Sequence, residues 1–202
     1  MGENGPVCIN DMSCMSCGHC VSVCPTGALD NSRCPYAETE PIPMEVLDAK
    51  TAYNFLRMRR SIRNFTPELV SEEKMKQLLD IARYAPTAAN SQGLYYIVVS
   101  DRELIKKITD CVADWMQEEI DNNSPRRRYF RKVLEVYRDR GVDIIGRNAK
   151  QLVFALAHRL NVTGVSNCEQ AWAYVELYAP TLGLGTTIMG FIETCARANY
   201  AP

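Results

Sequence analysis

The cysteines are distributed unevenly along this 202-residue chain, and their distribution limits the architectures that it can adopt. Three of the nine, Cys111, Cys168 and Cys195, are scattered through the later sequence and match no ligand spacing, so we expect buried free thiols there. The other six fall within the first 34 residues, at Cys8, Cys14, Cys17, Cys20, Cys24 and Cys34. Because 47% of all residues are hydrophobic, the chain beyond this cluster has enough apolar side chains for an ordinary core. The sequence therefore predicts a small cysteine-rich segment followed by a medium-sized domain.

The clustered cysteines have a regular spacing. From Cys14 to Pro25 the chain reads C-x2-C-x2-C-x3-C-P, which resembles the bacterial ferredoxin motif and predicts thiolate ligands for a 4Fe-4S cluster. Gly18 gives the backbone freedom to turn where a side chain would crowd the inorganic core. A zinc site fits less well, because zinc sites usually use two separated C-x2-C pairs or cysteines with histidines. We predict metal ligands among Cys14, Cys17, Cys20, Cys24 and Cys34.

The fourth ligand of this cluster has three candidates. In two-cluster ferredoxins the cysteine before the proline ligates the other cluster, so Cys14, Cys17 and Cys20 need a further partner. Cys8, Cys24 and Cys34 could each supply it, and Cys34 is followed by a proline, as a remote fourth ligand often is. The motif looks like the second half of a two-cluster ferredoxin without its first half. We expect one cluster in this chain, or two if the sequence is the truncated form of a longer protein.

Charge and hydropathy argue against nucleic-acid and membrane partners. The formal net charge is −1, and the one basic run, residues 126–132, is followed by Glu135, Asp139 and Asp143, which predicts a solvated helix face. No charged n-region leads into an apolar h-region, and no apolar stretch approaches the roughly 18 residues of a spanning helix. Clustered cysteines without a secretion signal favour a cytoplasmic location and metal or redox chemistry.

A proline-containing stretch separates the two parts of the chain. Residues 35–44 contain three prolines and no amphipathic period, which predicts a linker (36–47) between an iron–sulfur segment (1–35) and a second domain (48–202). In that domain we expect helices near 46–59, 71–84 and 167–182, the last interrupted near Pro180, with strands at 95–100, 151–157 and 186–191. Ser71 and Asp101 are suited to cap helices. The helix after Asp101 has an apolar stripe formed by Leu104, Ile105, Ile108, Val112, Trp115 and Met116. Few strands among many helices predict an α+β fold with the strands between helical layers.

Three short segments of this domain are suited to holding a flat, phosphorylated ligand. Arg59, Arg60, Ser61 and Arg63 place three guanidinium groups and a hydroxyl together, which suits a phosphate. Asn90 and Gln92 are two amides that both donate and accept hydrogen bonds, as the edge of a flavin ring requires. The glycines of residues 182–190 permit close backbone approach.

In this order and spacing, the three segments resemble the FMN-dependent nitroreductase family over residues 48–202. The resemblance implies that Arg59, Arg60, Ser61 and Arg63 bind the FMN phosphate and ribityl chain and that Asn90 and Gln92 lie near the isoalloxazine. It also implies that the backbone at Thr187, Met189 and Gly190 approaches the flavin N5 region. A helix–sheet–helix layered fold and a homodimer with flavin sites at the interface are expected as well. The family's C-terminal basic residues would lie beyond Pro202, so we expect an incomplete C-terminus.

The combined pattern predicts an enzyme in which a ferredoxin-type segment precedes a nitroreductase-like domain. We expect it to reduce small electrophiles such as nitroaromatics, quinones or enones through FMN, with electrons from NAD(P)H, a ferredoxin or the fused cluster. No side chain need act as a catalytic base. An alternative is a non-catalytic iron–sulfur and flavin electron-transfer module that docks on a larger redox complex. A third is a structural or redox-sensing metal site on a flavin-free scaffold.

Overall fold

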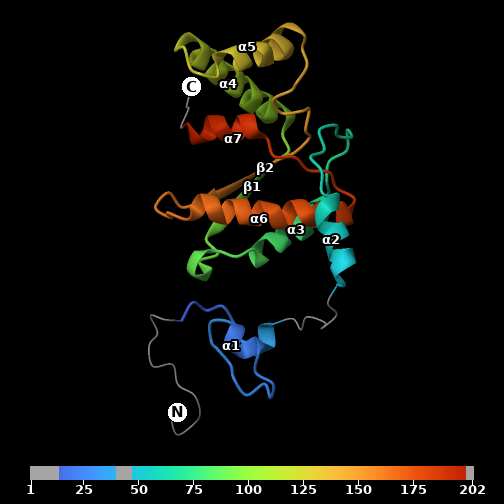
Figure 1. Ribbon diagram of the computed structural model, residues 1–202, viewed down its shortest axis with the longest axis vertical. Coiled ribbons are helices and arrows are strands. Elements are labelled where there is room, and N and C mark those ends of the chain that lie inside the picture. The colour runs from blue at the N-terminus through green and yellow to red at the C-terminus, as the bar shows by residue number, and fades with distance from the viewer. Residues whose placement is uncertain (1–13, 40–46, 199–202) are drawn as a thin grey trace.

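The computed structural model describes residues 14–39 and 47–198, which form a small cysteine-bearing segment and a larger body (Figure 1). Residues 14–39, which we call the cysteine segment, contain helix α1 (His19–Ser22) and the 3-10 helix η2 (Tyr36–Glu38). Residues 47–198, which we call the body, contain all the other described elements. Cys8 lies outside the described residues, as does much of the predicted linker.

The body alternates short helical stretches with two strands. It begins with α2 (Ala49–Met58), α3 (Glu72–Asp80) and the 3-10 helices η3 (Ile81–Tyr84) and η4 (Ala88–Asn90), followed by β1 (Leu94–Val99). Next come α4 (Arg102–Asp121), α5 (Arg127–Leu134), the π-helical turn η5 (Glu135–Asp139) and β2 (Leu152–Ala157). The described chain closes with α6 (Gly164–Tyr178), η6 (Ala179–Leu182) and α7 (Gly190–Arg197).

Local sequence explains where several of these helices begin. The Asp48 carboxylate accepts hydrogen bonds from the backbone N–H groups of Lys50 and Thr51 at the start of α2. The predicted caps Ser71 and Asp101 are confirmed, because their side chains accept from the third backbone N–H of α3 and α4. Each of these caps satisfies N–H groups that have no partner inside the helix.

The two strands lie between two layers of helices, as the sequence predicted. β1 and β2 pair antiparallel, with Leu94 opposite Ala157 and Val99 opposite Leu152. Figure 1 shows α4, α5 and α7 on one side of the pair and α6 and α3 on the other. The expected α+β, helix–sheet–helix architecture is therefore confirmed.

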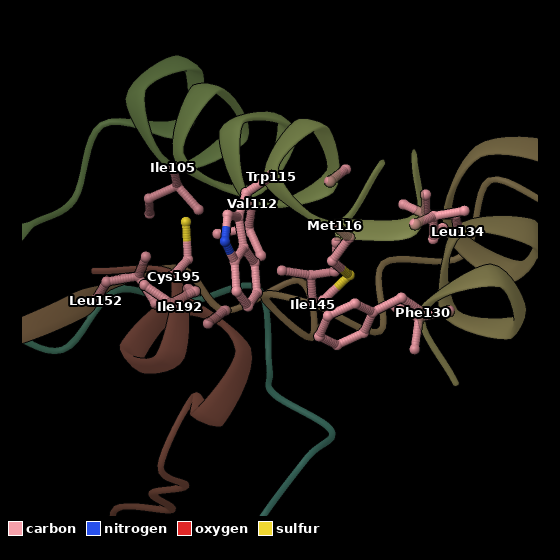
Figure 2. Close-up of a cluster of buried hydrophobic side chains, with 14 residues drawn as sticks. Ile105, Val112, Trp115, Met116, Phe130, Leu134, Ile145, Leu152, Ile192 and Cys195 are labelled. Carbon is pink, nitrogen blue, oxygen red and sulfur yellow. The ribbon is translucent and has the colours of Figure 1, made fainter. Parts of the chain in front are cut away.

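The larger hydrophobic core lies between α4, α5 and α7, and we call it the α4 core. Trp115 is at its centre, with Ile192 and Cys195 of α7 on one side and Ile145 and Phe130 on the other (Figure 2). The rings of Trp115 and Phe130 are 5.3 Å apart between centroids. A second core on the other side of the strands consists of Met75, Leu78, Ala82, Ala85, Ala171, Val175 and Ala179.

Two sequence expectations were wrong in detail. Leu104 is 46% exposed, because α5 and α7 cover the face of α4 that carries Ile105, Val112 and Met116. The last strand, expected at 186–191, is absent from the described chain. Thr186 instead accepts one backbone hydrogen bond, from the N–H of Ile62 at 2.8 Å, and residues from Gly190 onward form α7. One isolated bond does not make a ladder, and the helix buries Ile192 and Cys195 in the α4 core.

The basic run behaves as an amphipathic helix. Helix α5 buries Phe130, Val133 and Leu134, while Arg128, Arg131 and Lys132 are exposed on its outer side. Across the described residues, every helix is too short or too polar to cross a membrane.

Candidate iron–sulfur and flavin sites

The loop that carries the first three cysteines is shaped by two residues with left-handed backbone. Ser16 has φ 52° and Gly18 has φ 70°, and Gly18 immediately precedes α1. Successive N–H groups in such turns form concave anion-binding sites that many iron–sulfur centres use. The Cys17 and Cys20 thiols are exposed, and Cys14 is partly buried. The Asn31 side-chain amide donates to the Cys14 Sγ at 3.8 Å.

Cys34 lies beside this loop. A Cβ on Gly18 would be 3.4 Å from the Cys34 Sγ, so glycine leaves the space that the thiol occupies. Burial, and then the charges of Cys20, Cys14 and Cys17, raise the pKa of the Cys34 thiol, while the Gly18 N–H opposes the rise. The other three thiols are therefore near enough to Cys34 for their negative charge to disfavour its thiolate form.

Cys24 occupies a separate environment. Its Sγ is 3.7 Å from the Thr26 hydroxyl, and that hydroxyl, with the backbone N–H groups of Thr26 and Leu29, lowers the pKa of Cys24 to about 7. Of the two candidates for fourth ligand that the structure describes, Cys24 and Cys34, it is Cys34 that lies beside the loop of Cys14, Cys17 and Cys20. Within residues 14–39 and 47–198, no three cysteine, histidine or carboxylate side chains converge closely enough to hold a single metal ion.

The first and third flavin-related segments lie against each other. The N–H of Ile62 donates to the Thr186 carbonyl at 2.8 Å, which joins the 59–63 segment to the 183–187 segment. Gly185 is required at this contact, because an added Cβ would lie 2.8 Å from the Cγ2 of Ile62. Thr187 and Met189 are partly buried, and a Cβ on Gly190 would meet open space.

The arginines of the first segment differ in what they contact. Arg60 donates to the carbonyls of Arg57 and Arg59 and so closes the C-terminal end of α2. The Arg59 Nη1 is 3.6 Å from the Glu176 Oε1 of α6. That carboxylate oxygen is buried and has no hydrogen-bond partner among the described residues. The Ser61 hydroxyl and the exposed Arg63 guanidinium make no side-chain hydrogen bond within the described chain, so their donors are free for a ligand.

The second segment, residues 87–92, is held by a buried amide that the sequence did not reveal. Asn167 of α6 is 3% exposed, and its Oδ1 accepts from the Ala88 N–H at 3.2 Å. Its Nδ2 donates to the hydroxyls of Ser91 and Thr163 at 3.5 and 3.4 Å. The Gln92 N–H donates to the Thr87 hydroxyl.

This loop has a constrained backbone. Ala89, Asn90 and Gln92 all have positive φ, at 52°, 51° and 47°, which non-glycine residues adopt only where their surroundings impose it. The Gln92 side chain is exposed. The Asn90 Nδ2 donates to the carbonyls of Met15 and Ser16 in the cysteine loop, both at 3.1 Å. The predicted flavin loop and the predicted cluster loop are therefore in direct contact.

Within one chain, helix α6 lies between the second flavin-related segment and the first. It contacts Ala88 through Asn167 and Arg59 through Glu176, nine residues later. Nine residues are about 13 Å of helix and two and a half turns, so the two side chains are on opposite sides of α6. One chain thus brings the first and third segments together and holds the second apart from them. Asn167 and Glu176 could have been noticed as polar residues in a largely apolar helix.

Comparison with known proteins agrees with this two-part construction. The 4Fe-4S binding domain profile matches residues 7–30, and the nitroreductase family profile matches residues 56–200. The fold and the cysteine loop define a ferredoxin-type segment followed by a helix–sheet–helix oxidoreductase domain. The chain belongs to the nitroreductase family.

Several curated relatives are similar in sequence to part of this chain. Nitroreductase NfnB of Mycolicibacterium smegmatis is 27% identical over 168 residues, which cover 74% of this chain and 71% of that protein. Iodotyrosine deiodinase of Danio rerio is 30% identical over 88 residues, or 43% of this chain and 29% of that protein. With several such relatives the chain aligns over less than a third of their length.

Solved structures share the fold. A BluB-like flavoprotein from Clostridium difficile 630 has a TM-score of 0.55 at 18% identity, with 74% of this chain and 83% of that chain covered. A nitroreductase with bound FMN from Desulfitobacterium hafniense DCB-2 has a TM-score of 0.52 at 18% identity, covering 72% and 79%.

Proposed function

We propose that this protein is an FMN-dependent oxidoreductase that reduces small electrophilic acceptors and contains a 4Fe-4S cluster in its N-terminal segment. The observation that carries the flavin part is the contact between the 59–63 and 183–187 segments through Ile62 and Thr186. This contact sets the free donors of Ser61 and Arg63 near the glycine-containing backbone of the 183–187 segment, inside a domain of the nitroreductase family. The grouping of Cys14, Cys17, Cys20 and Cys34 supports the cluster.

The residues present fit an FMN phosphate. Arg63 and Ser61 would donate to it, and Glu176 would hold Arg59 in place beside it. When bound, FMN supplies the two-electron redox chemistry, and the protein supplies binding, orientation and donors. For a nitroaromatic acceptor, two electrons and two protons convert the nitro group to a nitroso group and release one water. The physiological acceptor in this proposal is a small molecule from the group of nitroaromatics, quinones and enones.

We also propose that the active form is a homodimer in a cytoplasmic, reducing environment. Because α6 keeps the 87–92 loop away from Arg59 within one chain, a second copy is needed to bring such a loop near the phosphate-binding segment. This supports flavin sites formed by two subunits. We retain residues 36–47 as the linker between the cluster segment and the FMN-binding domain.

The experiment that tests the function compares two exposed arginines. Replacing Arg63 with alanine removes a charge-assisted contact to phosphate, for which we expect FMN affinity to fall roughly 10- to 100-fold. Arg128→Ala on the outer side of α5 is the matched control and should bind FMN as the unmodified protein does. Equal FMN affinity in both variants would remove the assigned role of the 59–63 segment.

Turnover distinguishes an enzyme from a carrier. Anaerobic assays with a nitroaromatic and a quinone should show catalytic consumption of NAD(P)H or of a reduced one-electron donor. Cofactor reduction and reoxidation without acceptor turnover would instead support the electron-transfer module.

A further inference from the structure

One side chain of the body makes the hydrogen bonds that join it to the cysteine segment. Among hydrogen bonds and ion pairs of the described residues, only those of the Asn90 amide join residues 14–39 to residues 47–198. Its Nδ2 donates to the Met15 carbonyl and to the Ser16 carbonyl, each at 3.1 Å. An amide NH2 has two donors, and this contact offers it two acceptors.

The backbone on both sides of the contact is unusual. Ser16 and Asn90 each have left-handed φ, 52° and 51°, although neither is a glycine. Such conformations cost on the order of 1–3 kcal/mol each and persist where the surroundings impose them. The 87–92 loop is fixed by Asn167 and Thr87. Asn90 is therefore presented from a rigid platform rather than from a loose loop.

The contact point lies inside the predicted ligand loop. Met15 and Ser16 stand between Cys14 and Cys17, and each is adjacent to a cysteine of the group that surrounds Cys34. On the body side, Asn90 belongs to the loop that the sequence pattern places at the edge of the flavin ring. A side chain at this position sets the distance between the cysteine loop and that edge.

We propose that Asn90 is a positioning residue that docks the cysteine loop on the 87–92 loop, so that electrons pass between cluster and flavin at this contact. The proposal rests on the function proposed above. Two successive one-electron transfers through the cluster would deliver the two electrons that reduce one FMN, a low-potential one-electron donor would supply them, and the two protons would come from solvent. In this arrangement the Asn90 NH2 is committed to the cysteine loop, which leaves its Oδ1 for other partners.

The test is an isosteric change at Asn90. Asn90→Asp keeps the size and tolerates left-handed φ, but it removes both donors and sets a carboxylate against two carbonyl oxygens. Loss of two hydrogen bonds should lower the ratio of docked to undocked protein roughly 10- to 100-fold. Asn90→Gly is the second variant, because it keeps the backbone conformation and removes the amide without adding charge.

The chain provides a matched control. Asn123 also has left-handed backbone, φ 57°, and its exposed side chain makes no hydrogen bond within the described residues. It follows α4, and Figure 1 shows α4 and α5 at the opposite end of the body from the cysteine segment. Asn123→Asp therefore makes the same chemical change away from the contact.

Hydrogen–deuterium exchange and small-angle scattering on cofactor-loaded protein give readouts besides activity. We expect Asn90→Asp and Asn90→Gly to raise exchange in peptides covering 14–18 and 86–93, to enlarge the radius of gyration, and to slow flavin reduction by a one-electron donor at least ~10-fold. Asn123→Asp should match the unmodified protein. Unchanged exchange and scattering in both Asn90 variants would overturn the docking role. Unchanged electron transfer after demonstrated undocking would overturn the electron route. Flavin and iron contents of the unmodified sample test the proposed function separately.

Discussion

Replacing Gly185 with alanine tests most directly the contact between the 59–63 segment and the 183–187 segment. In Gly185→Ala the new Cβ would lie 2.8, 2.9 and 3.1 Å from the Cγ2, Cβ and Cγ1 of Ile62, all shorter than ordinary van der Waals contacts. Gly185 is not in the left-handed region, so the added methyl group changes packing rather than backbone strain. The two segments must move apart by several tenths of an ångström.

The expected loss has two parts. Overpacking a formed contact costs about 1–3 kcal/mol, and weakening the Ile62 to Thr186 hydrogen bond adds about 0.5–1.5 kcal/mol. Ile62 is 40% exposed and can partly move aside, so we expect about 2 kcal/mol in total. For a domain of this size that corresponds to a fall in Tm of about 4–8 °C.

A double mutant isolates the cause. Ile62→Ala removes the atoms that the new methyl group would meet, so the pair Gly185→Ala with Ile62→Ala should recover at least ~1 kcal/mol relative to the sum of the single changes. Gly93→Ala is the control, because its Cβ would meet only the Ser91 carbonyl at 3.7 Å. Denaturant unfolding and FMN titration are measured on the four variants and on the unmodified protein. Additive effects of the two substitutions, or an unchanged Tm in Gly185→Ala, would refute the packing argument.

Three further changes have expected outcomes. Phe130→Ala in the α4 core should lower the free energy of unfolding by about 3–5 kcal/mol because the ring is 2% exposed, and a loss below about 1 kcal/mol in denaturant unfolding would contradict that packing. Cys34→Ser should remove most of the iron and acid-labile sulfide from anaerobically purified protein while Cys24→Ser retains them, and the reverse pattern would make Cys24 the fourth ligand. Burial raises the pKa of Asp110, but the hydrogen bond from Lys106 and other contacts lower it by more, so the folded-state pKa is below its ordinary value. The carboxylate therefore stabilises the fold at pH values above its unfolded pKa of about 3.9. Asp110→Asn should therefore cost about 0.5–1 kcal/mol near pH 7, a difference that shrinks as pH falls below about 4; a pH-independent difference in urea titrations would contradict this assignment.

Patterns with a short-range cause were predictable from the sequence. Period and capping identified the helix after Asp101, and the apolar run at 151–157 identified β2. The cysteine spacing predicted a 4Fe-4S segment where the 4Fe-4S binding domain profile also matches, since this motif depends on neighbours a few residues apart. The prediction of a strand at 186–191 was wrong, because an apolar sequence pattern does not reveal whether a partner strand is available.

Contacts between distant residues could not be read from the chain. That Cys34 rather than Cys24 faces the other thiols depends on how residues 25–33 return to Gly18. Asn167 contacts Ala88, and Glu176 contacts Arg59, and the two residues of each pair are more than 70 positions apart in the sequence. The Asn90 contact with Met15 and Ser16 joins two parts that the sequence had separated by a linker, and no periodicity encodes it.

The central claim, that one chain holds both a flavin and an iron–sulfur cluster, is tested most directly by cofactor analysis of anaerobically purified protein. Heat-released flavin, iron and acid-labile sulfide are quantified on one sample, with visible spectra before and after reduction. We predict one FMN per chain, with iron and sulfide in equal amounts near four per chain if a single cluster is held. Iron and sulfide without flavin would contradict the proposed oxidoreductase, and flavin without iron would contradict the cluster at Cys14, Cys17, Cys20 and Cys34.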